Sequence, residues 1–452
     1  MQRAGLSNAA LAIFLLASAE LRSQPDTVQA AFAVAVTTPN ALQLPLPALT
    51  TTERAAFSRG RELFSQVWVA SPSVDTEVDG LGPLYNQAAC FACHQRNGRG
   101  QPPESEHERM RSALVRLSIP GSSLDGGPLP HPVYGEQLND TAITGSAPEG
   151  RAVIQWTEHS DYFADGDPVS LRHPMLTLSE LAYGPVGENL LTSLRVAPPI
   201  IGAGLLDAVP DSTLEALAAT PRPDGVSGRV NRVRDPTTGH VAVGKFGWKA
   251  NAASLAQQTA AAFRGDLGIT SRYYAVEHCP PQPTDCGLST ELDLTDIQLA
   301  DVVFYQAALA VPAPRNSGDA SVREGQRLFE EAGCQHCHLP TLTAGANALV
   351  PLLANTTFNA YTDLLLHDMG DALADGRPDY QAGPSEWRTA PLWGLGLLPT
   401  INEHQNLLHD GRARGVLEAI MWHGGEASLS RERVRVMNRQ ERDSIVAFVN
   451  SL

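Results

Sequence analysis

Hydrophobic residues recur at helical spacing in several segments of the chain, and the pattern between these segments is irregular. Apolar positions three and four residues apart predict helices at Thr51–Phe64, Ala252–Phe263, Leu292–Ala310, Val416–Trp422 and Gln440–Leu452. A short run such as Ala152–Trp156 instead predicts a strand, among many Gly and Pro residues. The pattern favours a mainly α fold whose N-terminal half is enlarged by insertions with short β-strands.

Two Cys-x-x-Cys-His pentads carry the strongest chemical signal, and they are Cys90–His94 and Cys334–His338. With 6 Cys and 13 His in 452 residues, one such pentad arises by chance in about two of a thousand chains. In each pentad the two thiols can add to the vinyl groups of a haem, and the histidine can then ligate its iron. The pentads therefore predict two covalently bound c-type haems, with anchors and proximal ligands Cys90, Cys93, His94, Cys334, Cys337 and His338.

Structural zinc and a pair of disulfides are the alternatives for these cysteines. Zinc sites pair two short Cys/His clusters that lie much closer together in sequence. Disulfides do not explain why a histidine follows the second cysteine in both pentads. Both alternatives are therefore weaker than haem attachment.

A short helical segment precedes each pentad and indicates a duplicated haem unit. The two segments are Arg59–Phe64 and Glu324–Phe329. Phe64 lies 26 positions before Cys90, whereas Phe329 lies only 5 positions before Cys334. The first copy thus contains an insertion of about 21 residues relative to the second.

The ends and the middle of the chain suggest domain boundaries. Residues 1–19 resemble a signal peptide, with Arg3, an apolar stretch and the cleavage-like Ala17–Ala19. Residues 20–50 are expected to form an extended or disordered lead-in, and the Pro-rich segment 311–319 a linker. These boundaries predict an N-terminal haem c domain over 51–310 and a C-terminal one over 320–452.

The charge and the first residues limit location and partners. A net charge of −16 argues against nucleic acid and anionic membranes as partners, and it is compatible with a small basic redox protein such as a cytochrome or a cupredoxin. The first apolar stretch is too short for a membrane span. Covalent c-type haem is normally attached outside the bacterial cytoplasm, so we expect a periplasmic protein without a stable membrane span after signal cleavage.

The two remaining cysteines, Cys279 and Cys286, flank a Pro-rich loop. In an exported protein a disulfide that closes this loop is expected. A redox-active pair is the alternative.

Several further segments give the chain a family resemblance from about Gly80 to Leu452. It resembles the bacterial di-haem oxidoreductases described as thiol oxidoreductases or peroxidases, which are related to the di-haem cytochrome c peroxidases. The segments that carry the resemblance are Gly80–Asn86, Arg195–Gly202, Phe246–Ala250, His367–Gly370, Glu386–Gly394 and His409–Arg412. The resemblance implies two cytochrome c-like haem domains.

Three residues match the peroxidase pattern of a Trp between the haems, then a Gln, then an acidic residue over the open haem. Trp248 and, ten positions on, Gln258 match the first two. Asp266 is the best match for the acidic residue, although the match requires a gap of two residues and the residue is Asp rather than Glu. A carboxylate there can take a proton from bound peroxide and return it to the distal oxygen. Without the resemblance, a core Trp, a surface Gln and a turn Asp would be the ordinary interpretations.

The resemblance also implies a sixth ligand for the second haem. Relatives place Met or Tyr fourteen residues after the His of a His-Asp-Gly segment, and the same count from His409 reaches His423. Met421 would take this place if the register slips, while His367 and Met369 are weaker candidates. A calcium site is doubtful, because Glu403–Leu408 replaces the relatives' Thr-x-Pro segment.

Together these residues predict a periplasmic di-haem oxidoreductase that is peroxidase-like. One haem would keep an open distal site, and a six-coordinate haem would pass electrons to it. Its substrate would be peroxide, or an organic or protein molecule. Two alternatives stay open, namely a pure electron-transfer cytochrome and a thiol/disulfide oxidoreductase that uses Cys279 and Cys286.

Overall fold

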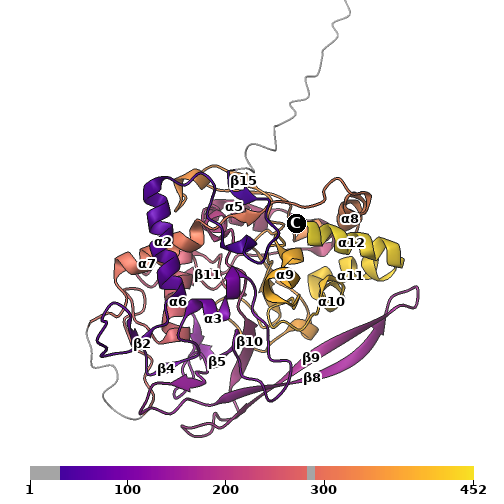
Figure 1. Ribbon diagram of the computed structural model, residues 1–452. Coiled ribbons are helices and arrows are strands. Elements are labelled where there is room, and N and C mark those ends of the chain that lie inside the picture. Colours follow the sequence, from indigo (N-terminus) through magenta and orange to yellow (C-terminus); the bar gives the residue numbers. More distant parts are fainter. Residues whose placement is uncertain (1–30, 282–290) are drawn as a thin grey trace, which may run out of the picture.

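The computed structural model describes residues 31–281 and 291–452 (Figure 1). The expected signal peptide over 1–19 and Cys286 lie outside these residues. The described part is 31% helical and 21% strand, so the prediction of a mainly α fold is wrong. Most strands have only two or three residues and are scattered among Gly- and Pro-rich loops, so they are too short to show a period-two pattern in the sequence.

The first helical unit is built on two crossing helices, α2 (Thr51–Ser65) and α7 (Asp296–Ala307). Thr50 caps α2 through a reciprocal pair with Glu53. Gly60 lies at the crossing, where an added Cβ would come within 1.9 Å of the Asp301 carbonyl oxygen. Only a glycine allows the two helices to approach this closely.

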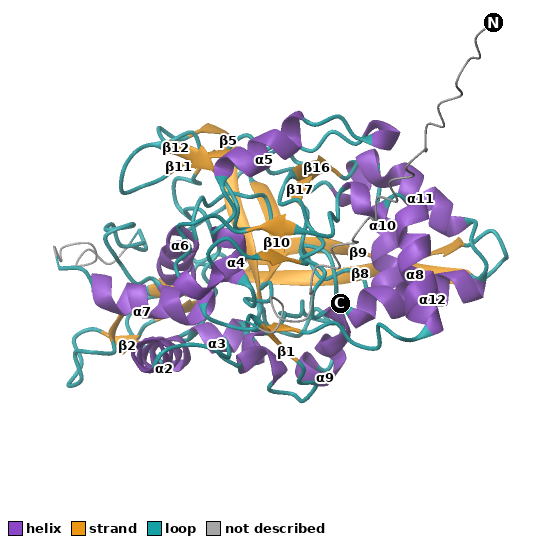
Figure 2. Cartoon of the chain, turned by 90° about the horizontal axis from the view of Figure 1, so that it is seen from above, coloured by secondary structure: helices purple, strands orange, loops and turns teal. Residues whose placement is uncertain are grey.

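The second helical unit repeats this arrangement with α8 (Ala320–Glu331) and α12 (Arg439–Ser451). Here Gly325 occupies the crossing, and an added Cβ would come within 1.8 Å of the Ser444 carbonyl oxygen. The two units lie at opposite ends of the molecule (Figure 2). The duplication expected from the two segments before the pentads therefore extends to how each segment packs.

The remaining helices are short except for α6, which belongs to the first unit. They are α3 (Cys90–Cys93), α4 (Ala203–Asp207), α5 (Asp211–Ala219), α6 (Leu255–Leu267), α9 (Leu398–Asn402), α10 (Val416–Trp422) and α11 (Ser428–Arg435). Single 3-10 turns lie at Ala41–Gln43, Gln95–Asn97, Pro223–Gly225, Cys334–His336, Pro351–Leu353, Asp371–Leu373, Leu395–Leu397 and Gly425–Ala427.

Two groups of longer strands lie between the helical units. An antiparallel sheet has the order β10 (Leu191–Val196), β5 (Ala113–Ser122), β6 (Pro128–Leu129), and a long hairpin is formed by β8 (Arg151–Tyr162) and β9 (Pro168–Ser179). Strands of two or three residues make most of the other pairs. These are β2 (Val69–Ala70) with β3 (Asp79–Leu81), β4 (Leu84–Tyr85) with β7 (Thr141–Ala142), β11 (Arg232–Arg234) with β12 (Val241–Val243), β14 (Leu342–Thr343) with β15 (Thr357–Phe358), and β16 (Leu366–Asp368) with β17 (Glu386–Arg388).

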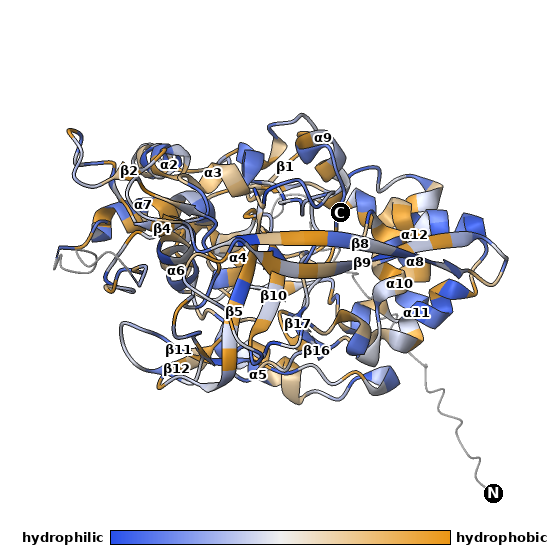
Figure 3. Cartoon of the chain, turned by 90° about the horizontal axis from the view of Figure 1, so that it is seen from below, coloured by the Kyte–Doolittle hydropathy of each residue, from blue (hydrophilic) through white to orange (hydrophobic). Residues whose placement is uncertain are grey.

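The hairpin β8–β9 joins the inserted strands to the second helical unit. It runs across the molecule towards α8, α10 and α12, and β9 contacts α10 (Figure 3). At its tip Asp161 pairs with Arg435 at 2.8 Å, and Asp165 pairs with Arg442 at 2.9 Å. Ile154 and Phe163 of the insertion share a core with helices α8 and α12. Packing therefore groups the inserted strands with the C-terminal helices rather than with α2 and α7.

The segments expected to be a lead-in and a linker are both packed against the protein. Within 31–50, Phe32 and Leu42 are buried in the core. β1 (Ala33–Val34) pairs in parallel with β13 (Val311–Pro312), which is the start of the expected linker. The described part of the lead-in is thus ordered, because its apolar residues and backbone groups find partners.

Candidate active site

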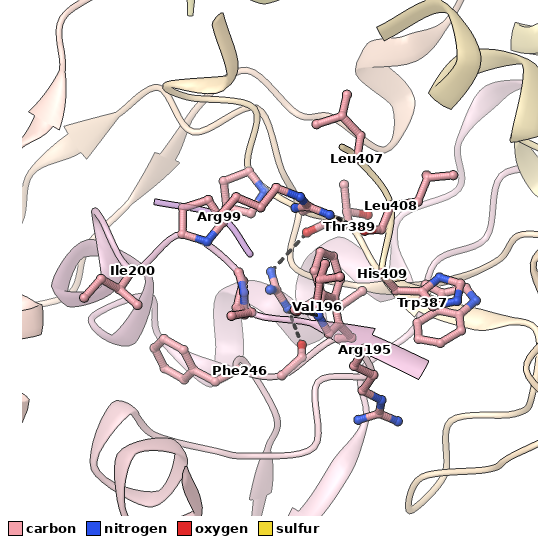
Figure 4. A pocket seen from close by; sticks show the side chains of 18 of the residues that line it. Arg99, Arg195, Val196, Ile200, Phe246, Trp387, Thr389, Leu407, Leu408 and His409 are labelled. Carbon is pink, nitrogen blue, oxygen red and sulfur yellow. Dashed lines mark hydrogen bonds between the residues drawn. The ribbon is translucent and has the colours of Figure 1, made fainter. Parts of the chain in front are cut away.

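Both pentads open into one continuous cavity of about 410 Å³. Its wall includes Cys90, Cys93, His94, Cys334, Cys337 and His338, together with Trp248, Gln258, Asp266 and His423. Figure 4 shows part of this wall, with side chains from both halves of the chain. All of the residues that the sequence predicted for the site are therefore brought together in one space.

The two pentad histidines are held in the same way. His94 Nδ1 lies 2.9 Å from the carbonyl oxygen of Pro198, and His338 Nδ1 lies 2.9 Å from that of Tyr361. Such a bond fixes the ring and leaves Nε2 as the atom available to a metal. Burial lowers the pKa of each histidine to about 4. Both rings are thus neutral at neutral pH, as a metal ligand must be.

An aromatic ring supports each of these histidines from the helix that precedes its pentad. Phe64 of α2 lies 6.2 Å from His94, and Phe329 of α8 lies 6.4 Å from His338, between ring centroids. The duplicated segments therefore position equivalent side chains at the two sites.

The four pentad thiols are unpaired and lie on the cavity wall. Burial raises the pKa of Cys90 and of Cys334 to about 12. Thiolates are the reactive form in thiol–disulfide exchange, so these two thiols are poorly suited to it. Cys279 is disulfide-bonded, whereas Cys286 lies outside the described residues.

Trp248 is connected by hydrogen bonds to the surroundings of both pentads. Its Nε1 donates to the carbonyl of Val196 at 2.9 Å, two residues before Pro198, whose carbonyl lies against His94 of the first pentad. Its own carbonyl accepts from the backbone N–H of Arg388 at 2.9 Å. Arg388 ends β17, which pairs with β16, the strand that carries His367 next to the second pentad.

Helix α6 brings Gln258 and Asp266 to the cavity on the side of the first pentad. Asp266 accepts a hydrogen bond from Gln137 Nε2 at 2.8 Å. Desolvation raises the pKa of Asp266, against the opposing charge of Arg116. Burial raises the pKa of Cys93, and the negative charge of Asp266 raises it further. A carboxyl with a raised pKa therefore lies close to Cys93 of the first pentad.

His423 follows α10 and lies on the cavity wall beside the second pentad. Its Nδ1 lies 2.6 Å from the carbonyl of Ala419, and a backbone carbonyl holds both pentad histidines in the same way. Met421 is buried in the second core and is not part of the cavity wall. Both ring nitrogens of His367 contact carboxylates, which leaves neither for a metal. Met369 lies on the wall but is a weak donor in comparison.

Two arginines on the wall were missed by the sequence analysis. Arg99 (Figure 4) donates to the carbonyl oxygens of Asn406 and Leu408. Arg388 donates to those of Gly247 and Thr389. Within the described part of the chain neither forms an ion pair with a carboxylate. Burial lowers the pKa of each to about 10, so both remain cationic at neutral pH and can receive an anion.

A stacked aromatic pair on the wall was also missed. Trp387 and His409 lie face to face, with ring centroids 3.5 Å apart and planes 7° apart (Figure 4). The ammonium of Lys249 covers Trp387 at 4.0 Å. In the sequence, His409 is only the residue from which the count of fourteen to His423 begins. No spacing pattern marks its stacking partner Trp387.

Comparison with known proteins identifies the family. Residues 29–452 match the family model described as "Di-haem oxidoreductase, putative peroxidase". The chain belongs to the di-haem oxidoreductase family. The resemblance seen in the sequence is thereby confirmed, and a haem-dependent redox function with it.

No curated protein matches the chain. Among solved structures it is similar to Kuenenia stuttgartiensis hydrazine synthase pressurized with xenon, with 13% identity and a TM-score of 0.33 over 99% of this chain and 100% of the other. A TM-score this low carries no argument about the present chain.

The residues of this di-haem oxidoreductase fit two haems. Each half of the cavity offers two thiols and a neutral imidazole with a fixed ring. Arg99 and Arg388 offer buried positive charge without a carboxylate partner among the described residues, as haem propionates require. No helix of the described residues is long and apolar enough to cross a membrane.

Proposed function

We propose that the protein is a periplasmic, peroxidase-like di-haem oxidoreductase with both haems attached through the pentad thiols. The observation that carries the proposal is the single cavity that both pentads share. His94 and His338 would be the proximal ligands, and Arg99 and Arg388 would neutralise propionates. Bound haem supplies the redox-active iron that peroxide chemistry and electron transfer need.

Asp266 and Gln258 give the first site its acid–base chemistry. Asp266 would take a proton from the entering peroxide and return it to the departing oxygen, which a positioned carboxylate can do. Its raised pKa brings it nearer to the pH at which both steps proceed. Gln258 lies nine residues before the end of α6 on the same wall and would orient the peroxide by hydrogen bonds.

His423 gives the second site a different character. Its Nε2 would be a further ligand that holds the second haem iron, and an imidazole in place of a thioether would lower the reduction potential of that iron. Trp248 would lie on the electron path between the sites. The acidic chain, with a net charge of −16, supports a small basic cytochrome or cupredoxin as the electron partner.

Steady-state turnover with hydrogen peroxide and a reduced cytochrome donor tests the proposal. We expect Asp266→Asn to lower kcat/KM for peroxide by about 100-fold or more, because general acid–base catalysis contributes at least that much. Asp140→Asn is the matched control, since Asp140 is also a partly buried carboxyl with a raised pKa near Cys93 but is not on the cavity wall. Equal activity of wild type and Asp266→Asn would remove Asp266 from the mechanism.

Electron paramagnetic resonance of the resting protein separates the proposal from an electron-transfer cytochrome. We expect one high-spin ferric haem that binds cyanide and one low-spin haem. Two low-spin haems that do not bind cyanide would instead identify a carrier without substrate chemistry.

Replacement of both Cys279 and Cys286 by Ser tests the thiol/disulfide alternative. We expect peroxide turnover and haem content to stay at the wild-type level. Loss of turnover in a variant that keeps both haems would favour the thiol function.

A further inference from the structure

His367 lies beside the second pentad between two carboxylates and is almost completely buried, with 2% of its surface exposed. Its Nε2 lies 2.9 Å from Asp363 Oδ2, and its Nδ1 lies 2.8 Å from Glu426 Oε2. Ionised carboxylates only accept hydrogen bonds, so both ring nitrogens must donate and the ring is an imidazolium. Charge-assisted bonds of this kind are the strong class of hydrogen bond.

One end of this bridge reaches the pentad itself. Cys337 Sγ lies 3.6 Å from His367 Nδ1. Asp363 also accepts from Arg222, whose guanidinium donates to the carbonyl of His336 at 2.6 Å. His367 and Arg222 therefore fix the segment that carries the second haem's anchor.

The other end reaches the loop that carries His423. Glu426 lies three residues after His423, in the middle of the 3-10 turn Gly425–Ala427. Its carboxylate also accepts from the backbone N–H groups of Ser227 at 2.8 Å and Asp368 at 3.2 Å. A side chain at Gly425 would come within 2.2 Å of the Asp368 carbonyl oxygen, so this loop packs directly on the strand that carries His367.

The bridge thus connects the two segments that hold opposite faces of the second haem site. The proximal side is the pentad Cys334–His338, and the distal side is the turn after α10. Neither segment is a long regular element, since His423 lies beyond the last residue of the seven-residue helix α10. A short helix and a turn restrain a side chain poorly unless other bonds hold them.

We propose that His367 is a positioning residue that latches the His423 loop to the second pentad and so keeps His423 at its coordination position. This inference rests on the proposed function in one respect, the role of His423 as a ligand. His367 does not bind the iron, because both of its ring nitrogens are engaged. Removal of the latch lets His423 leave more often, so an exogenous ligand gains access to the second haem.

Cyanide binding to the ferric holoprotein, followed separately for each haem, measures this access. We expect His367→Phe and Glu426→Gln to accelerate cyanide binding at the second haem by about 10- to 100-fold, the factor that corresponds to loss of a charge-assisted hydrogen bond. The first haem provides an internal reference and keeps its wild-type rate. Glu426→Gln preserves size, so it tests the latch even where His367→Phe folds poorly.

His336→Phe is the matched control. His336 is a histidine inside the pentad that lies 3.5 Å from a carboxylate, that of Asp224, yet it has no bond to the His423 loop. We expect the wild-type rate in this variant. An equal acceleration in His336→Phe and His367→Phe would overturn the latch, because any disturbance of the pentad would then suffice.

The His423→Ala variant separates the failure of the latch from that of the ligand assignment. If His423→Ala leaves the second haem low-spin, His423 is not the ligand, and the latch fails together with that part of the proposed function. If His423→Ala makes it high-spin while His367→Phe leaves the cyanide rate unchanged, only the latch is overturned. The reduction potential of the second haem in His367→Phe gives an independent test by the direction of its change. Loss of the His423 ligand raises this potential, whereas loss of the nearby positive charge of His367 alone lowers it.

Discussion

The two helical units that carry the pentads share one scaffold and differ in what faces the pentad histidine. In both, a glycine lets two helices cross, a Phe from the first helix lies against the pentad histidine, and a backbone carbonyl fixes its ring. The first unit adds α6 with Gln258 and Asp266, whereas the second adds α10 and His423. A duplicated scaffold can therefore hold two similar cofactors while the chain between the copies gives each a different environment.

The shared scaffold predicts equal sensitivity at the two helix crossings. Gly60→Ala and Gly325→Ala would each gain about 1 kcal/mol of helix propensity. The new Cβ would, however, lie 1.9 Å or 1.8 Å from a carbonyl oxygen, and overpacking of this kind costs about 3 kcal/mol. We expect each variant to lose one haem, as measured by haem content per chain, and to show a lower thermal midpoint.

Gly318→Ala is the control for this pair, because an added Cβ there meets nothing within 4 Å. Loss of haem in only one of the two crossing variants would show that the units do not fold on equivalent scaffolds.

The difference between the units predicts an acid limb in the pH dependence of turnover that belongs to the first unit. Asp266 must be ionised to accept a proton, and desolvation raises its pKa above the ordinary carboxyl value of 3.8. The value of kcat/KM for peroxide should therefore fall as the pH decreases through this raised pKa, at a higher pH than that at which ordinary surface carboxyls are protonated. In Asp266→Asn, with activity lower by about 100-fold, the residual rate should lack this limb.

The same profile measured for Gln258→Glu sharpens the assignment, because a second carboxyl on α6 would raise the pKa of Asp266 further and shift the limb to higher pH. A limb that stays in Asp266→Asn would assign the titration to another group.

Much of the site could be predicted from the sequence because its chemistry depends on short local motifs. The pentads and the helices Thr51–Ser65 and Val416–Trp422 follow from local spacing patterns, and Thr50 caps the first of these helices. Arg99, Arg388 and the Trp387–His409 stack instead depend on contacts between segments far apart in the sequence. No periodicity marks such contacts, and the residue type alone does not distinguish a buried arginine from one on the surface.

Short strands in the N-terminal half were expected, but the full strand content could not be predicted, for a related reason. The run Ala152–Trp156 indicated only the buried beginning of β8, which extends to Tyr162. Its later residues are mostly exposed, and they are held by pairing with β9 and by ion pairs at the tip rather than by an alternating apolar face. The packing of these strands with the C-terminal helices likewise has no signal in either segment alone.

The link between the two units predicts a moderate effect of Trp248 on electron transfer. Trp248→Phe keeps an aromatic ring but loses the Nε1 hydrogen bond to Val196. We expect reoxidation of the second haem after mixing with peroxide to slow by about tenfold, a modest loss for a displaced group at a reacting site. Trp156→Phe is the control, since Trp156 lies off the cavity wall, and an equal slowing there would remove Trp248 from the electron path.

The smallest expected effect concerns how the hairpin β8–β9 is held to the second unit. Arg442 is buried, with 2% of its side chain exposed; it pairs with Asp165 and Asp167 and covers the ring of Phe163 at 4.0 Å. Arg439 pairs with the same Asp167, but 71% of its side chain is exposed. Arg442→Ala loses packing as well as hydrogen bonds and should lower the free energy of unfolding by about 2 kcal/mol.

Arg439→Ala should leave the urea midpoint unchanged, because an exposed ion pair is screened by solvent. If both variants shift the midpoint equally, charge rather than buried contact holds the hairpin, and the second unit would then depend on ionic strength in a way the first does not.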